Sequence, residues 1–287
     1  MTGLPVSGTV ARVIEVRGLS KVFPNGVEAL RGVSFAVGAG QFVCVLGSSG
    51  AGKSTLLRCL NGTLEVSAGA VEVDGVDVVA AGPSERRGLR RRIGFVHQQY
   101  DLVERLSVLE NVLVGRLGHS HPLLSSLRLF SRADRELALH NLDRVHLLER
   151  AGRRADALSG GEKQRVAIAR ALAQEPRVLL ADEPVASLDP ELARGVMDDL
   201  HRAAREDGVT TLVNTHDLQL ARSYADRVIG LARGVVVFDG SPAGLDAAAL
   251  DRIYRRSPSG EERAHGSSDS VRAAAPRPAF GAGQPAG

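Results

Sequence analysis

The chain has 287 residues, 44% of them hydrophobic and 24% charged, and a formal net charge of +3. This length accommodates one large domain, or one domain with a sizeable insertion, and so small a net charge creates no field that would by itself attract nucleic acid. The two cysteines, Cys44 and Cys59, are too few for a disulfide scaffold or a cysteine–histidine zinc site, and both lie in apolar runs typical of core packing.

Residues 1–12 lack the charged and then apolar sequence pattern of a signal peptide. The residues that follow, in the first third of the chain, predict strands of two kinds. Residues 12–16 and 33–37 alternate apolar and polar side chains, which indicates half-buried strands. Residues 42–46 are continuously apolar, as in strands buried on both faces of a parallel sheet. Asp74-Gly75 lies between two alternating runs and predicts a β-hairpin.

The rest of the chain alternates strand and helix signals around a helical insertion. Residues 178–181 and 211–214 are two more continuously apolar runs. Residues 99–158 contain no continuous strand signal, and residues 132–152 have the apolar spacing of an amphipathic helix. The leucines and valine on that face are Leu137, Leu142, Val145, Leu147 and Leu148. Helical patterns follow the buried strands at Lys53–Leu60, Pro190–Arg205 and Leu218–Ala225. This order predicts an α/β core with an antiparallel β part and a helical insertion.

Two further features bound the organisation of the chain. No run reaches the roughly 18 apolar residues that a membrane span requires. Residues 257–287 have few large apolar side chains and many Gly, Pro, Ala and Ser, so we expect a disordered tail.

The motif G-x-x-x-x-G-K-[ST] occurs at residues 47–54, between a buried strand and a helix, which is the context it requires. Its glycines let the backbone N–H groups wrap around phosphate. Lys53 would meet the β- and γ-phosphates, and the Ser54 hydroxyl would bind Mg²⁺. We therefore predict a nucleotide site at the phosphate loop, which comprises Gly47, Ser48, Ser49, Gly50, Ala51, Gly52, Lys53, Ser54 and Thr55.

Other polar residues follow apolar strand runs and suit the same site. Asp182 ends a strand and could hold the metal, and Glu183 could be the general base for an attacking water. By itself such a pair is more often a solvated turn or a helix cap. His216 could contact the γ-phosphate, although a lone histidine is usually structural, and Gln98 alone would be an ordinary surface residue. The basic run at 85–92 has no interleaved aromatic residues and indicates a solvated face.

A second anion-binding helix N-terminus is predicted about a hundred residues after the first. Residues 158–162, Leu-Ser-Gly-Gly-Glu, precede a long helix-forming run. A serine hydroxyl and glycines at a helix N-terminus favour binding of an anion. We call residues 158–162 the signature segment.

These features, in this order and spacing, resemble the ATPase subunits of ABC transporters over residues 12–255. The resemblance rests on Phe23, the phosphate loop, Gln98, the signature segment with Glu162 where glutamine is usual, "VLLADEP", "SLDP" and His216. It implies a P-loop NTPase core of ABC type, an antiparallel β subdomain and a helical subdomain at about 99–160. It also implies a head-to-tail homodimer, in which ATP lies between the phosphate loop of one subunit and the signature segment of the other.

The same resemblance implies roles for particular residues. Phe23 would stack on adenine, with a core aromatic as the alternative. Gln98 would contact Mg²⁺ and the attacking water. The unit of Ser159, Gly160 and Gly161 would bind the γ-phosphate in trans. Asp189 would line the dimer interface, and His216 would complete the γ-phosphate contacts.

Residues 96–118 and 180–190, with the extension after Gly118, resemble most the ATPases of phosphonate importers. That resemblance implies an ATP-hydrolysing subunit at the cytoplasmic face of the inner membrane, attached peripherally. Two copies would dock on an integral membrane permease fed by an extracytoplasmic binding protein, with no nucleic acid. The groove for the permease would present the apolar contacts Leu102, Val103, Leu106 and Val108, or these residues would simply pack the helical subdomain. His97 and Asp101 depart from the pattern near that groove.

Two alternatives stay open at the level of sequence. The importer could carry another small solute, such as a polar amino acid. The chain could also be a soluble ABC ATPase acting on nucleic acid or ribosomes. That class typically has two ATPase units in one chain or long coiled-coil insertions, neither of which is found in the sequence.

Overall fold

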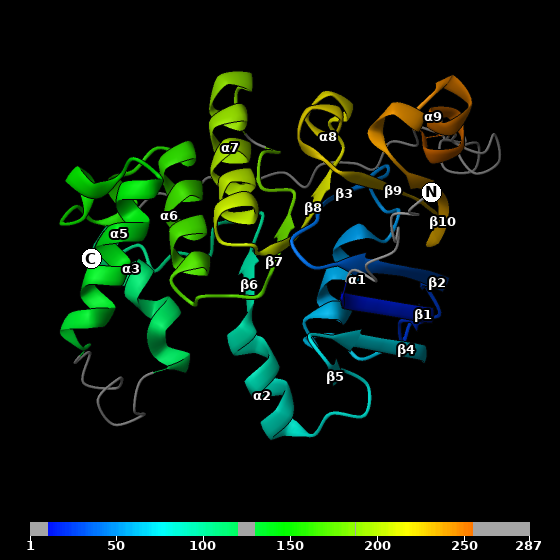
Figure 1. The fold of residues 1–287 in the computed structure, drawn as a ribbon, viewed down its shortest axis with the longest axis horizontal. Helices are drawn as coiled ribbons and strands as arrows, with labels where there is room; N and C mark the ends of the chain where they lie inside the picture. The colour runs from blue at the N-terminus through cyan, green and yellow to red at the C-terminus, as the bar shows by residue number, and fades with distance from the viewer. Residues whose placement is uncertain (1–10, 120–129, 187, 255–287) are drawn as a thin grey trace, which may run out of the picture. The chain divides into compact units, whose positions relative to one another are not determined.

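The computed structural model describes residues 11–119, 130–186 and 188–254. In these residues the chain forms two sheets with helices around them (Figure 1). The smaller sheet is antiparallel, with strand order β2-β1-β4-β5. Its strands are β1 (Arg12–Val22), β2 (Glu28–Gly38), β4 (Ala68–Val73) and β5 (Val76–Asp77). The predicted hairpin is confirmed, because Asp74 and Gly75 adopt φ values of 48° and 74° and join β4 to β5.

The larger sheet has strand order β10-β9-β3-β8-β7-β6 and is parallel except for β10. Its strands are β3 (Phe42–Leu46), β6 (Ile93–Val96), β7 (Val178–Asp182), β8 (Thr210–Thr215), β9 (Arg227–Ala232) and β10 (Val235–Gly240). Every residue of β3, β7 and β8 is buried, as their apolar sequences predict. Leu46 pairs with Thr215 and Asp182 with Asn214, so the residues that follow these strands meet at one edge of the sheet.

Alternate residues of the central strands pack into two separate cores. Phe42, Cys44 and Leu46 face the core shared with α6 (Gly160–Leu172), α7 (Pro190–Glu206) and α8 (Leu218–Tyr224). Val43 and Val45 face the core shared with α1 (Lys53–Leu60) and the antiparallel sheet. The helices α1 and α6 therefore cover opposite faces of the larger sheet. Both cysteines are fully buried, as expected, and burial raises the pKa of Cys44 to about 12 and of Cys59 to about 11.

The insertion between β6 and β7 is helical, as predicted, and its helices gather at one end of the larger sheet (left in Figure 1). Ser107, Ser131 and Ser159 each begin a helix with a capping box, in which the serine and the third helical residue satisfy each other's backbone N–H groups. The remaining helices and turns are α2 (Pro83–Arg92), α3 (Val108–Val114), η1 (Gly115–Gly118), α5 (Arg132–Arg144), η2 (Leu148–Arg150), η3 (Ala155–Ala157), η4 (Pro242–Gly244) and α9 (Ala247–Tyr254).

The structure corrects the expected amphipathic helix over residues 132–152. Helix α5 ends at Arg144, so Val145 and Leu147 are buried from a turn beyond the helix. Leu148 does not belong to the apolar face, because 43% of it is exposed.

The outcomes of the other predictions about the chain differ. The basic run at 85–92 lies in helix α2. The strands β9 and β10 and helix α9 were not predicted. The predicted tail and part of the extension after Gly118 lie outside the described residues. In the described ranges, no helix has the length and apolar content to cross a membrane.

Candidate functional site

The phosphate loop joins β3 to α1 along a path that only glycine permits at two points. Gly52 has a φ of 103°, and a Cβ there would lie 2.5 Å from the carbonyl oxygen of Ala29 on β2. A Cβ at Gly47 would collide with the carbonyl oxygen of Leu231 on β9. Gly52 is the N-cap of α1 and supplies no side-chain hydrogen bond. The first-turn N–H groups of α1 have no intrahelical partner, so they are available to an anion.

Lys53 lies over this loop as a buried cation. Its Nζ donates to the carbonyl oxygens of Gly47 at 2.9 Å and Ser48 at 3.2 Å. The same Nζ lies 3.1 Å from Oε1 of Glu183, and only 4% of the Lys53 side chain is exposed. The ion pair joins the loop after β3 to the residue after β7, two segments that the sequence separates by more than a hundred residues.

Asp182 lies at the end of β7 with its carboxylate turned toward α1. Its Oδ1 accepts hydrogen bonds from the Ser54 hydroxyl at 2.9 Å and from the Asn214 amide at 2.8 Å. Asp182 is buried, and within the described residues no lysine or arginine pairs with it. A buried carboxylate beside a hydroxyl is a donor set that Mg²⁺ prefers. No cluster of three His, Cys, Asp or Glu ligands occurs in the described ranges, so phosphate and water oxygens would complete the shell, as is common for Mg²⁺.

Glu183 follows Asp182 in a left-handed backbone conformation, with a φ of 49°. Its N–H donates to the Asn214 carbonyl oxygen at 3.1 Å. A non-glycine residue in this region carries strain that persists only where the surroundings hold it. The turn directs one carboxylate oxygen to Lys53 and brings the other to 3.9 Å from Nδ1 of His216. The predicted residues Lys53, Glu183 and His216 therefore form one cluster.

Among the described residues, neither Gln98 nor Phe23 forms a hydrogen bond or ion pair with this cluster. Gln98 follows β6, whose Val96 pairs with Ala181 next to Asp182, and its side chain is exposed. Phe23 is half-buried in the turn after β1 and belongs to neither core, which disfavours the core-aromatic alternative. The ammonium of Lys21 lies 5.4 Å from the centre of the Phe23 ring.

The signature segment begins α6 on the other face of the sheet. Ser159 is exposed, and its hydroxyl accepts from the Glu162 N–H at 3.3 Å while Oε2 of Glu162 accepts from the Ser159 N–H at 2.9 Å. The backbone hydrogen bond from Ser159 is the main cause of a lowered pKa at Glu162. Gly161 is buried, and a Cβ there would lie 3.0 Å from the Leu192 side chain on α7.

Asp189 is the N-cap of that neighbouring helix. Its Oδ1 accepts from the N–H groups of Glu191 at 3.1 Å and Leu192 at 3.0 Å. Leu192 therefore links Asp189, through its backbone N–H, to Gly161 of the signature segment, through its side chain. Neither the "SLDP" turn nor the signature segment contacts the phosphate loop through any interaction found in the described part of this chain.

The structure adds site residues that sequence reasoning missed. Asn214 binds Asp182 through its side chain and Glu183 through its backbone. Its signal was present, since it is a polar residue inside a fully buried strand. Arg170 of α6 binds the backbone of Tyr100 and Asp101, in the loop after Gln98. These residues are far apart in sequence, and no local pattern marks them.

Comparison with known proteins gives consistent results. Residues 30–186 match the family described as ABC transporter. The chain is similar to the phosphonates import ATP-binding protein PhnC of Shouchella clausii, with 50% identity over 85% of this chain and 92% of that protein. It is similar to PhnC 1 of Rhodopseudomonas palustris, with 47% identity over 84% and 89%.

Solved structures resemble the fold as well. The ATP-binding cassette MJ0796, a dimer bound to ADP and Pi, has a TM-score of 0.70 and 35% identity over 80% of this chain and 98% of that one. The protein cbiO1 of Clostridium perfringens has a TM-score of 0.72 and 30% identity over 84% and 93%.

Proposed function

The chain belongs to the ABC transporter family, and from that premise we propose that it is the ATP-hydrolysing subunit that energises an importer for phosphonates or related phosphorus oxyanions. The observation that carries the ATPase proposal is the cluster of Lys53, Ser54, Asp182 and Glu183 at one edge of the larger sheet. The names of the relatives support the substrate class.

ATP binds through the phosphate loop in this proposal. The first-turn N–H groups of α1 and the loop backbone would hold the phosphates, with Lys53 as the cation beside the γ-phosphate. Phe23 would stack on the adenine ring. In the structure, the Nζ of Lys53 forms an ion pair with the Glu183 carboxylate. In this proposal, phosphate binding draws the lysine toward the ligand and leaves the carboxylate free.

Magnesium fits the residues around Asp182. The Ser54 hydroxyl and the Asp182 carboxylate would hold the ion, with Gln98 as the residue that reaches it from the loop after β6. When bound, the ion neutralises charge on the phosphate oxygens. Asn214 keeps Asp182 oriented, since the amide Nδ2 donates to Oδ1 of the carboxylate.

Glu183 would act as the general base. A water molecule attacks the γ-phosphorus, Glu183 accepts its proton, and the bond from phosphorus to the bridging oxygen breaks to leave ADP and phosphate. His216, 3.9 Å from Glu183, would contact the γ-phosphate and orient that carboxylate.

The signature segment would serve a second copy of the chain. Ser159 and Gly161 begin a helix on the opposite face of the sheet from α1, which favours binding of the partner's γ-phosphate. Asp189 would line the same dimer interface. The solved dimer of MJ0796 supports a dimeric arrangement for this family.

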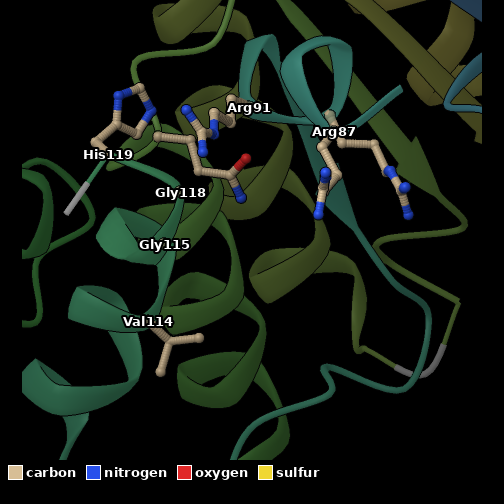
Figure 2. A pocket seen from close by; sticks show the side chains of 8 residues that line it. Arg87, Arg91, Val114, Gly115, Gly118 and His119 are labelled. Carbon is tan, nitrogen blue, oxygen red and sulfur yellow. The ribbon is translucent and has the colours of Figure 1, made fainter. Parts of the chain in front are cut away.

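A permease would dock beside α2. A cavity of about 370 Å³ lies between α2 and the turn η1, lined by Arg87, Arg90, Arg91, Val114, Gly115, Gly118, His119 and Gln174 (Figure 2). Its arginines favour an acidic permease segment. Of the candidate apolar contacts, Val108 is fully buried in the core and Leu102 is partly buried there, so for these two the alternative holds that they pack the helical subdomain. Val103, 49% exposed, remains a candidate contact.

Growth on a phosphonate tests the substrate class. A strain lacking the gene should fail to grow on 2-aminoethylphosphonate as sole phosphorus source and should grow on inorganic phosphate. The wild-type gene should restore growth, and Glu183→Gln should not. Normal growth of the deletion strain on several phosphonates and on phosphite, with no second importer present, would remove the substrate assignment and leave the ATPase assignment in place.

A further inference from the structure

The loop that follows Gln98 has an unusual backbone. Tyr100 and Asp101 are consecutive non-glycine residues with φ values of 56° and 49°. Tyrosine rarely adopts this left-handed region, because its Cβ crowds the backbone. A conformation of this kind persists only where other contacts hold it. The surroundings of the loop show what holds it.

Arg170, in the last turn of α6, binds the loop at both residues. Its Nη1 donates to the carbonyl oxygen of Asp101 at 2.5 Å and its Nη2 to that of Tyr100 at 2.8 Å. One planar guanidinium thus fixes two successive peptide groups, which the single ammonium of a lysine cannot reproduce. Burial lowers the pKa of Arg170, and the nearby Asp101 carboxylate opposes that shift. The side chains of His97 and Asp101 close the loop, with 3.4 Å between Nδ1 and Oδ2.

The Tyr100 side chain reaches the opposite end of the same helix. Its hydroxyl lies 3.1 Å from the position that a Cβ of Gly160 would occupy. Tyr100 therefore lies beside the signature segment with its hydroxyl and binds the last turn of α6 through its backbone carbonyl oxygen. A Cβ at Gly115 would collide with the carbonyl oxygen of Arg170, so the glycine lets η1 close over this end of the helix.

We propose that Arg170 and Tyr100 are positioning residues that fix the Gln98 loop to helix α6, so that a displacement of the signature segment moves Gln98. The inference rests on the proposed function, in which Gln98 contacts the metal and the attacking water. It adds that a γ-phosphate bound at the signature segment of one subunit is sensed at the Gln98 of that same subunit.

A double-mutant cycle tests the proposal on the full-length chain. Arg170→Lys keeps the charge and removes the two-pronged contact. We expect kcat for ATP hydrolysis to fall about tenfold and the Mg²⁺ concentration for half-maximal activity to rise. The Kd for ATP without Mg²⁺ should stay within about twofold. Since Arg170 acts through Gln98, Arg170→Lys should cause no further loss of kcat in a Gln98→Ala background.

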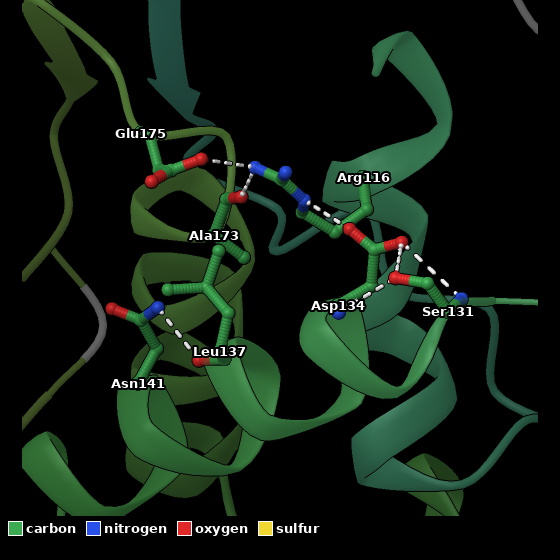
Figure 3. Close-up of polar contacts among 7 residues, drawn as sticks. All are labelled: Arg116, Ser131, Asp134, Leu137, Asn141, Ala173 and Glu175. Carbon is green, nitrogen blue, oxygen red and sulfur yellow. Dashed lines mark hydrogen bonds and ion pairs between the residues drawn. The ribbon is translucent and has the colours of Figure 1, made fainter. Parts of the chain in front are cut away.

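Arg116→Lys is the matched control. Arg116 also binds the end of α6, at the carbonyl oxygen of Ala173, and pairs with Asp134 at 2.8 Å and Glu175 at 2.7 Å (Figure 3). Asp134 lies on α5 and Glu175 follows the end of α6, and in the described part of the chain neither forms a hydrogen bond or ion pair with residues 97–101. The control should lower thermal stability without changing the Mg²⁺ requirement.

Three results would overturn the proposal: losses in kcat that multiply in the double variant, a loss of ATP affinity matching the loss of kcat, or an unchanged kcat. If Arg170→Lys does not fold, Tyr100→Phe removes only the hydroxyl beside Gly160. It should lower kcat a few-fold, again only when Gln98 is present, and an equal loss in the Gln98→Ala background would contradict the coupling. A wild-type chain that does not hydrolyse ATP would instead overturn the proposed function.

Discussion

The two helix N-termini that suit an anion, at α1 and at α6, differ in how the chain surrounds them. At α1, Gly52 supplies no side-chain cap, and the loop is enclosed by the backbones of β2 and β9. At α6, the Ser159 side chain caps the helix, and Ser159 and Gly160 are exposed. The N-terminus of α1 lies beside charged side chains of its own chain, namely Lys53, Asp182 and Glu183. The N-terminus of α6 faces outward, with no reacting group of its own chain in contact with it among the described residues.

In the proposed function, this difference would divide one reaction between two surfaces of the fold. Lys53, Asp182 and Glu183 gather at α1 because the parallel strands β3, β7 and β8 end at the same edge of the sheet. Helix α6 packs on the other face, so its N-terminus adds nothing to that edge within one chain. The proposed function thus accounts for a chain with two helix N-termini suited to an anion and one set of proposed catalytic groups.

The largest expected effect belongs to the α1 side. Glu183→Gln removes the base and leaves Lys53 and the loop in place, so hydrolysis should fall by roughly 10²- to 10⁴-fold while ATP binding stays. The ATP-bound dimer should persist, which size-exclusion chromatography with ATP would detect. Hydrolysis at the wild-type rate would exclude Glu183 as the base.

A glycine-to-alanine substitution at each of the two helix N-termini should distinguish their roles more sharply. In Gly52→Ala, the new Cβ would meet a backbone oxygen at 2.5 Å where φ is 103°. Because the backbone of β2 cannot move aside easily, we expect the affinity for ATP to fall at least about tenfold, which is a loss of about 1.4 kcal/mol in the free energy of binding. In Gly161→Ala, the Cβ would meet the flexible Leu192 side chain at 3.0 Å.

We therefore expect Gly161→Ala to bind ATP within about twofold of wild type and to lose part of its hydrolysis rate. Fluorescent-nucleotide titration of each purified variant provides the comparison. Equal losses of ATP affinity in the two variants would contradict the division between the two helix N-termini.

The smallest effect concerns the cap of α6. Glu162→Gln keeps the hydrogen bond to Ser159 and removes a negative charge near a helix N-terminus, which costs about 0.5 kcal/mol. The pKa of Glu162 is lowered on folding, so its charge stabilises the protein above the unfolded value, 4.5, and the benefit is lost as pH falls through the folded value. The Tm difference between wild type and variant should therefore be present at pH 7, decline below pH 4.5, and vanish once the pH lies below the lowered pKa of Glu162 in the folded protein. A constant difference across that range would show that the charge is irrelevant.

Sequence reasoning worked best where one short segment determines the geometry. Lys53–Leu60 is a helix with the predicted bounds, because the phosphate loop fixes where α1 begins. The strands β3, β7 and β8 are rich in apolar and β-branched residues, which fits their burial on both faces. The fold class followed from the order of these elements.

Prediction failed where tertiary contacts decide. Val145 and Leu147 continue the apolar spacing of α5, yet the helix has already ended and they are buried from a turn. For Val108 the sequence left two alternatives open, a contact with the permease or packing of the helical subdomain, and the packing of α3 decides for the second by burying it completely. The left-handed backbone at Tyr100 and Asp101 contains no glycine to signal it, since Arg170, about 70 residues later, holds it in place.

Cross-linking tests most directly the claim that the two helix N-termini act on one ATP from different chains. Ser49 in the phosphate loop and Ala157 just before the signature segment are exposed, and both native cysteines are buried. Chains with Ser49→Cys and chains with Ala157→Cys, each also carrying Glu183→Gln to retain ATP, would be mixed and treated with a short bis-maleimide. We predict an ATP-dependent covalent heterodimer. A single chain that carries both cysteines and cross-links only within itself would contradict the account.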